Sequence, residues 1–513
     1  MEMAELLATY REKKAQYLAG GGAAKIEAQH RRGKFTARER IELFLDKGSF
    51  VEIGMFAQQK VKNFDLTEPV PGDGVVTGYG TVKGCKVVVA AQDFTVQGGS
   101  VGSMHAEKIC RAIRMALQMG VPFVTINDSG GARIQEGVEA VEGYSKIFAH
   151  NIEASGVIPQ ISMIGGPCAG GAVYSPALTD FVVMIQGSNM FISGPPVIKE
   201  ITGEDVDPEQ LGGALIHNQI SGAAHFYAAN EQEAFDLIKE LLSYLPGNYL
   251  ELPRKTNGED RFRSVPELEE IVPVEQAKVY DIRDVIRAVV DNGKFLEVQP
   301  MFAPNIVVGF TRIGGESVGL VANQPKNKAG FLDIDASNKA ARFIRFCDAF
   351  NIPLLTLVDI PNYLPGVEQE YGGIIRHGAK VLYAYGEATV PKITVILRKA
   401  YGGGYIAMGS KNLGADITLA LPTAEIGVMV SEAAVNILYR EQIKKLAQPE
   451  EFRAEKIKEF NELFGNPYYA AAKGIVDIVV EPRDLRNQLL AGFKFLKTKK
   501  VKITPKKHGN IPL

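Results

Sequence analysis

Two glycine-rich turns are the segments of this chain whose residue types could best support catalysis. Residues 165–176 read GGPCAGGAVYSP and residues 398–405 read RKAYGGGY, and each segment follows an apolar run. Glycine lets backbone N–H groups approach a ligand without interference from a Cβ atom. Adjacent N–H groups at the start of a helix can stabilise a developing oxyanion. The turns therefore predict two oxyanion-binding sites, although tight turns that serve only close packing would use the same glycines.

Both turns lie within an internal repeat at an offset of about 231 residues. The residues that recur on a candidate helix are Lys108, Arg111, Ile113 and Arg114, which reappear as Lys339, Arg342, Ile344 and Arg345. A glycine pair begins eleven residues after Pro159, at Gly170, and again eleven residues after Pro391, at Gly402. Such a repeat predicts two related domains with two related binding devices.

Composition excludes several classes of protein. The 513 residues carry 57 basic and 59 acidic side chains, so no overall field points to nucleic acid or to a membrane surface. No apolar run approaches the length of a membrane-spanning helix, and the first residues are unlike a secretory signal. The four cysteines are scattered and the seven histidines form no ligand pattern, which favours a cytoplasmic location without a metal site.

The elements alternate in a way that is typical of an α/β fold. Helices are expected within residues 1–48, where Thr36 and Glu39 form a capping-box pattern. The β-rich run at 86–91 and the helical stretch at 106–119 indicate β-α-β units. The proline-rich, charged segment 246–281 separates the copies, so we expect domains at 1–255 and 256–513.

The last part of the second copy is expected to be helical after Ser431 and again from about Leu485. From Lys494 onward the chain carries seven lysines. Because the rest of the chain is neutral, we interpret this tail as a solvated, partner-contacting or frayed terminus and not as a nucleic-acid arm.

A second glycine loop, NDSGGARIQE at 127–136, ends another candidate strand, and DIPNYLPG at 359–366 is its copy. Ligands of open α/β sheets bind beyond the carboxyl ends of the strands. Asp128 and Asp359 at these ends could act as acids or bases, or could cap turns.

Residues 98–102 match the G-x-S-x-G pattern of a nucleophile elbow. In the second copy, however, Phe331 replaces Ser100, whereas Gly99 persists as Gly330. The backbone turn is therefore what repeats, and a serine hydrolase is not expected. His225 and His377 are expected to be structural or rim residues, and no P-loop is present.

With these motifs the chain resembles the carboxyltransferase subunits of biotin-dependent acyl-CoA carboxylases, of the propionyl-CoA carboxylase β type. It equally resembles the carboxyltransferase subunit of methylmalonyl-CoA decarboxylase. The segments that carry the resemblance are 33–40, 71–80, 92–99, 127–136, 155–161, 166–177, 400–403 and 507–513. The resemblance implies two tandem crotonase-like (ClpP/crotonase) domains related by internal duplication, with the acyl-CoA side in the first and the biotin side in the second.

The resemblance also implies the reaction. A carboxyl group would pass from carboxylated biotin, held on a separate carrier, to the α-carbon of a short acyl-CoA, with propionyl-CoA giving methylmalonyl-CoA. The amides of Gly170 and Gly171 would hold the thioester oxygen as its enolate forms, and those of Gly403 and Gly404 would hold the ureido oxygen of biotin. Free biotin nitrogen could take the α-proton, so the protein need not supply a base. The expected substrate-binding residues are Ser129, Gly130, Gly131, Ala132, Arg133, Ala169, Tyr174, Tyr405 and Ile406.

The implied partners are other subunits. No Met-Lys-Met biotin-attachment pattern is present, so a biotin carrier and a biotin carboxylase would complete the system. The alternative is a sodium-pumping methylmalonyl-CoA decarboxylase, in which membrane subunits would complete a transfer that runs in reverse. A homo-hexamer with sites at dimer interfaces is implied in both cases, without nucleic acid and without direct membrane insertion. A non-catalytic acyl-CoA-binding scaffold would have lost a glycine turn, and a hydratase would need paired carboxylates.

Departures from the family pattern cluster in the second copy. Asn362 and Tyr363 stand in place of Gly-Phe, Gly404 replaces alanine or serine, and Ile406 stands where propionyl-type members often have aspartate. Ser431 lies in a segment that usually contains glycine. The biotin side is therefore where this chain differs from its relatives.

Overall fold

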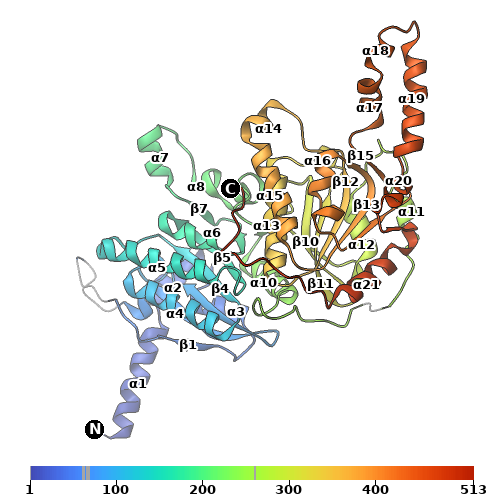
Figure 1. Cartoon of the computed structure of the whole chain (residues 1–513). Coiled ribbons are helices and arrows are strands. Elements are labelled where there is room, and N and C mark those ends of the chain that lie inside the picture. The colour runs from blue at the N-terminus through green and yellow to red at the C-terminus, as the bar shows by residue number, and fades with distance from the viewer. Residues whose placement is uncertain (1, 60–63, 65–69, 259–260) are drawn as a thin grey trace. The chain divides into compact units, whose positions relative to one another are not determined.

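The computed structural model describes residues 2–59, 64, 70–258 and 261–513. They form two compact units, of which the first ends at Glu251 and the second begins at Leu252. Each unit is an α/β structure with its own sheet (Figure 1). The assignment of the acyl-CoA side to residues 1–255 and of the biotin side to residues 256–513 stays a prediction.

The sheet of the first unit has the strand order β1-β2-β3-β4-β5-β6-β8, and β7 pairs with the end of β5. The first three strands are antiparallel and the following ones are parallel. The strands are β1 (Val51–Ile53), β2 (Val75–Val82), β3 (Cys85–Gln92), β4 (Phe123–Ser129), β5 (Gln160–Ala169), β6 (Phe181–Ile185), β7 (Asn189–Phe191) and β8 (Phe226–Ala228).

Helices join and cover these strands. The α-helices are α1 (Met3–Leu18), α2 (Ala23–Arg31), α3 (Ala37–Phe44), α4 (Ser103–Met119), α5 (Val138–Ala154), α6 (Tyr174–Leu178), α7 (Pro195–Thr202), α8 (Pro208–Gly212), α9 (Ala214–Gln219) and α10 (Glu231–Tyr244). The 3-10 turns are η1 (Pro71–Gly74), η2 (Gln97–Gly99), η3 (Ile134–Glu136) and η4 (Gly170–Val173). The capping box is confirmed at α3, where Thr36 accepts from the Glu39 N–H and Glu39 accepts from the Thr36 N–H.

The second unit repeats this topology. Its sheet has the order β9-β10-β11-β12-β13-β14-β16, and β15 pairs with β13 as β7 pairs with β5. The strands are β9 (Phe295–Val298), β10 (Ile306–Ile313), β11 (Glu316–Asn323), β12 (Leu354–Ile360), β13 (Lys392–Tyr401), β14 (Ile417–Ala420), β15 (Glu425–Gly427) and β16 (Ile478–Val479). The repeat in the sequence is therefore a repeat of strand order and of strand direction.

The helices of the second unit include an addition between β15 and β16. The α-helices are α11 (Leu268–Ile271), α12 (Ile282–Val289), α13 (Ile334–Ala349), α14 (Val367–Gly372), α15 (Ile374–Glu387), α16 (Gly402–Ala407), α17 (Ser431–Leu438), α18 (Arg440–Ile443), α19 (Pro449–Phe464), α20 (Pro467–Ala472) and α21 (Leu485–Leu496). The 3-10 turns are η5 (Asp291–Gly293), η6 (Lys328–Gly330), η7 (Lys411–Leu413) and η8 (Pro482–Asp484). Helices α17 and α21 begin at the expected Ser431 and Leu485.

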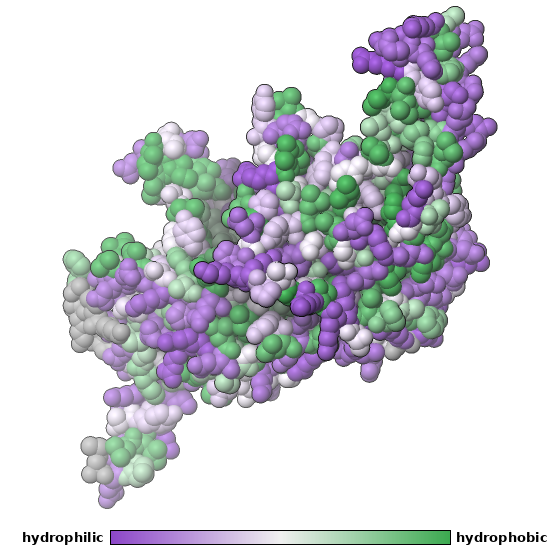
Figure 2. Space-filling model, viewed as in Figure 1, coloured by the Kyte–Doolittle hydropathy of each residue, from purple (hydrophilic) through white to green (hydrophobic). Residues whose placement is uncertain are grey.

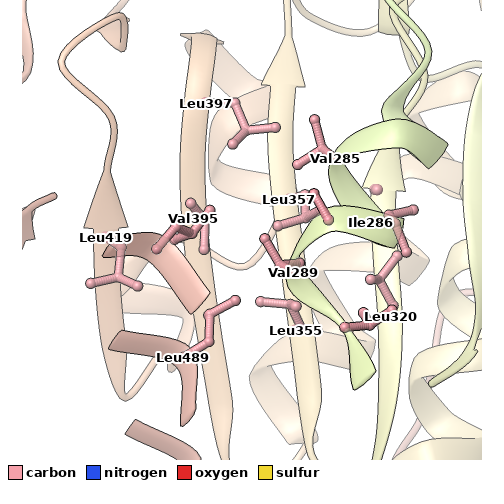
Figure 3. Packing of buried hydrophobic residues seen from close by; sticks show 14 of the residues in the cluster. Val285, Ile286, Val289, Leu320, Leu355, Leu357, Val395, Leu397, Leu419 and Leu489 are labelled. Atoms are coloured by element: carbon pink, nitrogen blue, oxygen red, sulfur yellow. The ribbon is translucent and has the colours of Figure 1, made fainter. Parts of the chain in front are cut away.

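The core of the second unit shows why alternating apolar residues matter. Alternate side chains of a strand point to one face. On β12 and β13 these are Leu355 with Leu357 and Val395 with Leu397, all of them buried. Figure 3 shows them facing side chains of α12 and of α21, such as Leu489. Burial of this apolar surface is the dominant favourable contribution to folding.

The lysine-rich tail lies against its own unit. Lys497 pairs with Glu316 at 2.8 Å and Lys499 with Asp416 at 2.8 Å. These contacts favour a docked terminus over a frayed one. Among the helices of the described residues, none is both long enough and apolar enough to cross a membrane.

Candidate active site

The first glycine turn, residues 169–174, lies where β5 ends and α6 begins. Gly170 has a φ of +62°, a conformation that favours glycine. The first N–H groups of a helical turn have no acceptor within the turn. Among the described residues, the Gly171 N–H has no hydrogen-bond acceptor. The turn therefore presents a backbone donor of the kind that an oxyanion needs.

An aromatic wall supports this turn. A Cβ atom on Gly171 would stand 3.0 Å from Cδ2 of Tyr144, so any other residue fits only if the ring or the turn moves. Tyr144 stacks on Phe148 with ring centroids 5.9 Å apart, and Phe148 meets Tyr174 edge to face at 5.9 Å. Tyr174 is half-exposed and presents its ring beside the turn. A substrate with an apolar acyl group could pack against these rings.

The loop after β4 lies beside the end of β5, as expected from the sequence. The Gly131 N–H donates to Ser129 Oγ at 3.1 Å. A Cβ on Gly131 would stand 3.1 Å from the carbonyl oxygen of Ala169. Gly130 and Ala132 are exposed next to the buried Ser129. The structure thus brings the predicted residues 129–132 and 169–171 together.

Arg133 does not have the position that a substrate-binding side chain needs. Its guanidinium is 1% exposed and pairs with Asp73 and, at 2.9 Å, with Glu136. It also donates to the carbonyl oxygen of Ser100 at 2.8 Å. Burial raises the pKa of Asp73, against the effect of Arg133. The charge of this guanidinium is therefore used inside the unit and anchors the loop, and a role of Arg133 in substrate binding stays a prediction.

The two aspartates at the strand ends are neutralised by arginines. Asp128 pairs with Arg40 at 2.9 Å, and Asp359 pairs with Arg398 at 2.8 Å. All four side chains are fully buried. Tyr280 also donates to Asp359 at 3.0 Å. A buried carboxylate that is held by arginine is not available as a general base, so these residues fix the strand ends.

The nucleophile-elbow pattern is a backbone feature, as the sequence suggested. A Cβ on Gly99 would stand 2.2 Å from the carbonyl oxygen of Asp128, and one on Gly330 would stand 2.5 Å from that of Asp359. Glycine is conserved between the two copies because each turn touches a strand end. Ser100 Oγ accepts from Arg133 Nε at 3.3 Å.

The two histidines singled out from the sequence hold local structure. Nδ1 of His225 accepts from the Val182 N–H at 3.1 Å. Nδ1 of His377 lies 2.9 Å from Oδ1 of Asn338. Within the described residues, no group of three or more His, Cys, Asp or Glu side chains could hold a metal ion.

The second glycine turn, residues 401–406, joins β13 to α16. Gly402 has a φ of +54° and matches Gly170. The Gly403 N–H has no acceptor among the described residues. The Gly404 N–H, in contrast, donates to Oδ1 of Asn362 at 3.2 Å. Of the two amides expected to hold biotin, one is open and one is engaged.

A tyrosine also supports the second turn, but it comes from a different element. The Tyr363 ring lies 3.9 Å from the position of a Cβ on Gly403, and its hydroxyl donates to the Gly378 carbonyl at 3.2 Å. Burial raises the pKa of Tyr363 to about 12, so the hydroxyl is a neutral donor at pH 7. Tyr405 is partly buried and Ile406 is 49% exposed on α16.

Three features of the site were missed in the sequence. Tyr144 has no recognisable spacing relative to Gly171, and the Arg40 and Arg398 partners of the aspartates come from α3 and β13, which are not equivalent elements. In the sequence, Asn362 stands out only as a departure from the family pattern. Its contact with Gly404 could have been suspected because both positions depart together.

Comparisons with known proteins agree with this geometry. The family model for the carboxyl transferase domain matches residues 28–511. The chain is 56% identical, over all of both chains, to the propionyl-CoA carboxylase carboxyltransferase subunit of Haloferax mediterranei. It is 54% identical, over 98% of both chains, to the methylmalonyl-CoA decarboxylase subunit alpha of Propionigenium modestum.

A solved structure of the transcarboxylase 12S hexamer with methylmalonyl-coenzyme A bound is similar throughout. It has a TM-score of 0.99 and 51% identity, and the match covers 100% of this chain and 99% of that one. A single-chain long-chain acyl-CoA carboxylase matches with a TM-score of 0.83 at 28% identity, over 96% of this chain and 49% of the other. The α/β fold with two crotonase-like domains is thereby confirmed. The chain belongs to the carboxyl transferase domain family and is a carboxyltransferase.

Proposed function

We propose that this carboxyltransferase moves a carboxyl group from biotin on a separate carrier to the α-carbon of propionyl-CoA. The observation that carries the proposal is the pair of glycine turns. In each turn one backbone N–H has no acceptor in the described part of the chain, that of Gly171 after β5 and that of Gly403 after β13. Two oxygens gain negative charge during the transfer and can accept hydrogen bonds: the thioester oxygen of the acyl-CoA and the ureido oxygen of biotin. Two separate donor turns suit two such oxygens.

In this proposal the first turn acts on the acyl-CoA. The Gly170 and Gly171 amides bind the thioester oxygen and stabilise the enolate that forms when the α-proton leaves. The Tyr144–Phe148–Tyr174 wall excludes water beside it, and the loop at 129–132 closes the other side. In the second turn, Gly403 binds the ureido oxygen, and bound biotin supplies the carboxyl carrier and the proton acceptor.

The fit of the turns to these groups depends on the absence of side chains. Gly170 and Gly402 have positive φ angles, and a Cβ on Gly171 would crowd the Tyr144 ring. No carboxylate or imidazole needs to act as a base, in keeping with Asp128 and Asp359 both being held by arginines.

We also propose a homo-oligomer, with a hexamer and active sites at dimer interfaces as the assembly. Apolar side chains are exposed on two helical segments, α7 and the α17–α19 hairpin (Figure 2). They include Ile201, which is 77% exposed, Ile437 at 64% and Leu438 at 66%. Exposed apolar side chains that gather on one surface are typical of association surfaces. The similar transcarboxylase 12S protein is a hexamer.

The reverse transfer is the second candidate, because similarity to a methylmalonyl-CoA decarboxylase subunit is nearly as high as to a carboxylase subunit. The direction would be set by the partner: a biotin carboxylase with its carrier, or membrane subunits of a sodium pump. Affinity purification of the tagged chain from its own cells separates the two, since only one set should be recovered. A cytoplasmic location stays a prediction from the four free cysteines.

The decisive experiment uses the purified chain, free biotin and methylmalonyl-CoA. The carboxyl group should pass to the biotin nitrogen, whose proton goes to the α-carbon, so that propionyl-CoA accumulates only when biotin is present. The rates with malonyl-CoA and ethylmalonyl-CoA, compared with the rate for methylmalonyl-CoA, show which acyl group the protein prefers. If no ester is consumed even with a biotinylated carrier protein, the proposed function is wrong.

A further inference from the structure

The side chain of Asn362 lies across the second glycine turn in a fixed orientation. Its Oδ1 accepts from two backbone N–H groups, those of Gly404 at 3.2 Å and of Tyr363 at 2.9 Å. An oxygen that accepts twice cannot be exchanged with the NH2 group of the same amide without losing both bonds. The two donors therefore determine where Nδ2 lies.

Nδ2 is next to the turn and is not used by the protein. It lies 3.2 Å from the position that a Cβ on Gly402 would take. Among the described residues no acceptor pairs with it, and Asn362 is only partly buried. The carboxamide thus covers the buried Gly404 amide with its oxygen and offers two N–H donors beside the exposed Gly403.

Asn362 and Gly404 depend on each other. A Cβ on residue 404 would stand 2.9 Å from Cα of Asn362 and 3.1 Å from its carbonyl carbon. Backbone atoms cannot rotate away as a side chain can, so the close approach of Asn362 requires glycine at 404. In the first unit the equivalent positions are Gly131 and Ala172, because Ala132 bridges to Val101 just after η2 as Tyr363 bridges to Leu332 just after η6. The two departures from the family pattern are therefore one structural change.

We propose that Asn362 is a ligand-contacting residue of the second turn, whose Nδ2 donates to the ureido oxygen of biotin in place of the Gly404 N–H. The turn would then hold this oxygen with one backbone donor, at Gly403, and one side-chain donor. The inference rests on the proposed function, since it assumes biotin at this turn.

Physical reasons favour a role of Asn362 as a donor over the alternative, in which its side chain only blocks the Gly404 N–H and must leave before the ligand binds. A donor held by two hydrogen bonds is preorganised, so little reorganisation is needed when charge develops on the ligand. Displacing the Asn362 side chain instead would break its two partly buried hydrogen bonds before the ligand gained one. A neutral amide also adds no charge next to a carboxylated ligand.

The test measures biotin-dependent consumption of methylmalonyl-CoA with biotin methyl ester, an uncharged acceptor. Asn362→Asp keeps the size and both backbone N–H contacts but removes the donor. We expect kcat/KM for the biotin ester to fall about 100-fold or more, the typical effect of losing one oxyanion donor. The KM for methylmalonyl-CoA, read at saturating biotin ester, should stay within about twofold because the acyl-CoA turn is untouched.

A double-mutant cycle at positions 362 and 404 uses only uncharged residues and so avoids the negative charge that Asn362→Asp introduces. Gly404→Ala should displace Asn362 and reduce kcat/KM for the biotin ester at least tenfold. The double variant Asn362→Gly/Gly404→Ala recreates the Gly131–Ala172 pair of the first unit and uncovers the amide at 404. It should recover to within about tenfold of the wild type, because one donor replaces the other. Melting curves and size-exclusion profiles verify that each variant is folded.

The outcomes separate the proposals. Wild-type kcat/KM for the biotin ester in Asn362→Asp, or a double variant no better than Gly404→Ala, would overturn the role of Asn362. A wild-type protein that consumes no methylmalonyl-CoA, either with biotin methyl ester or with a biotinylated carrier protein, would instead refute the proposed function.

Discussion

Gly171→Ala tests the first turn at the point where the structure leaves least space. The added Cβ would stand 3.0 Å from Cδ2 and 3.2 Å from Cε2 of Tyr144. Carbon atoms in contact lie about 3.5–4.0 Å apart, so either the ring or the turn must move by several tenths of an ångström. Tyr144 is 6% exposed and stacked on Phe148, which leaves the turn as the part that yields. Overpacking of this kind costs about 1–3 kcal/mol of stability.

The displaced turn carries the Gly171 N–H. Loss of the hydrogen bond from this N–H to the substrate oxygen should lower kcat. Removing one oxyanion donor lowers kcat by about 10²–10³, or about 2.7–4 kcal/mol in the barrier. The donor acts mainly on charge that develops in the transition state, so the KM for methylmalonyl-CoA should change little. The assay is biotin-dependent formation of propionyl-CoA, together with urea denaturation for stability.

Gly386→Ala is the matched control. Gly386 lies in α15, and its added Cβ would meet only Leu413 Cδ1 at 3.6 Å. Alanine in a helix is more favourable than glycine by about 0.5–1 kcal/mol, so this variant should be slightly more stable with unchanged kcat. Adding Tyr144→Leu to Gly171→Ala should recover part of the lost rate by making room. If Gly171→Ala shows wild-type kcat and stability, the Tyr144 ring does not hold this turn and the reasoning fails.

The other predictions concern buried contacts outside the two turns. Gly330→Ala should destabilise the second unit by about 3 kcal/mol or more, as strain at positive φ adds to a contact of 2.5 Å with the Asp359 carbonyl; normal urea unfolding would contradict this. Ser100→Ala should keep kcat within about threefold, since only a 3.3 Å bond from Arg133 is lost; complete inactivation would revive a serine nucleophile. Arg133→Met should cost about 3–5 kcal/mol by leaving two buried carboxylates unpaired, which equilibrium denaturation would measure. Burial lowers the pKa of Lys339 to about 7. The unfolded state therefore binds more protons between pH 7 and the ordinary lysine pKa, so the stability of the wild type should rise with pH relative to Lys339→Met; parallel pH profiles would contradict the assignment.

The repeat could be predicted from the sequence because its strongest markers are buried and structural. Lys108 donates to the Gly72 carbonyl at 2.7 Å, and Lys339 donates to the carbonyls of Gln299 and Phe302 at 2.8 and 2.7 Å. Each lysine satisfies backbone acceptors in the segment between the first two strands of its sheet. Such a role tolerates no other residue type easily, so the two lysines stayed in register while the surrounding surface diverged.

The partners of the predicted site residues could not be found from spacing. Arg133 is expected to bind substrate, and no pattern in the sequence shows that its guanidinium pairs with Asp73, sixty residues earlier. Asp128 and Asp359 occupy equivalent strand ends, yet their arginines come from α3 and from β13. Long-range ion pairs are settled by packing in three dimensions, and a one-dimensional pattern does not contain them.

The difference between the two turns is confined to the loops that face them. Gly170 and Gly402 keep nearly the same φ, +62° and +54°, so duplication preserved the backbone device itself. What changed is the loop after the preceding strand, where Asn362 meets the turn instead of a glycine. A backbone turn must keep its glycines to keep its N–H groups, whereas a facing loop can exchange side chains freely. Under the proposed function, two copies of one glycine turn bind different oxygens because the facing loops and the residues that touch them have changed. These are the positions where specificity should be sought.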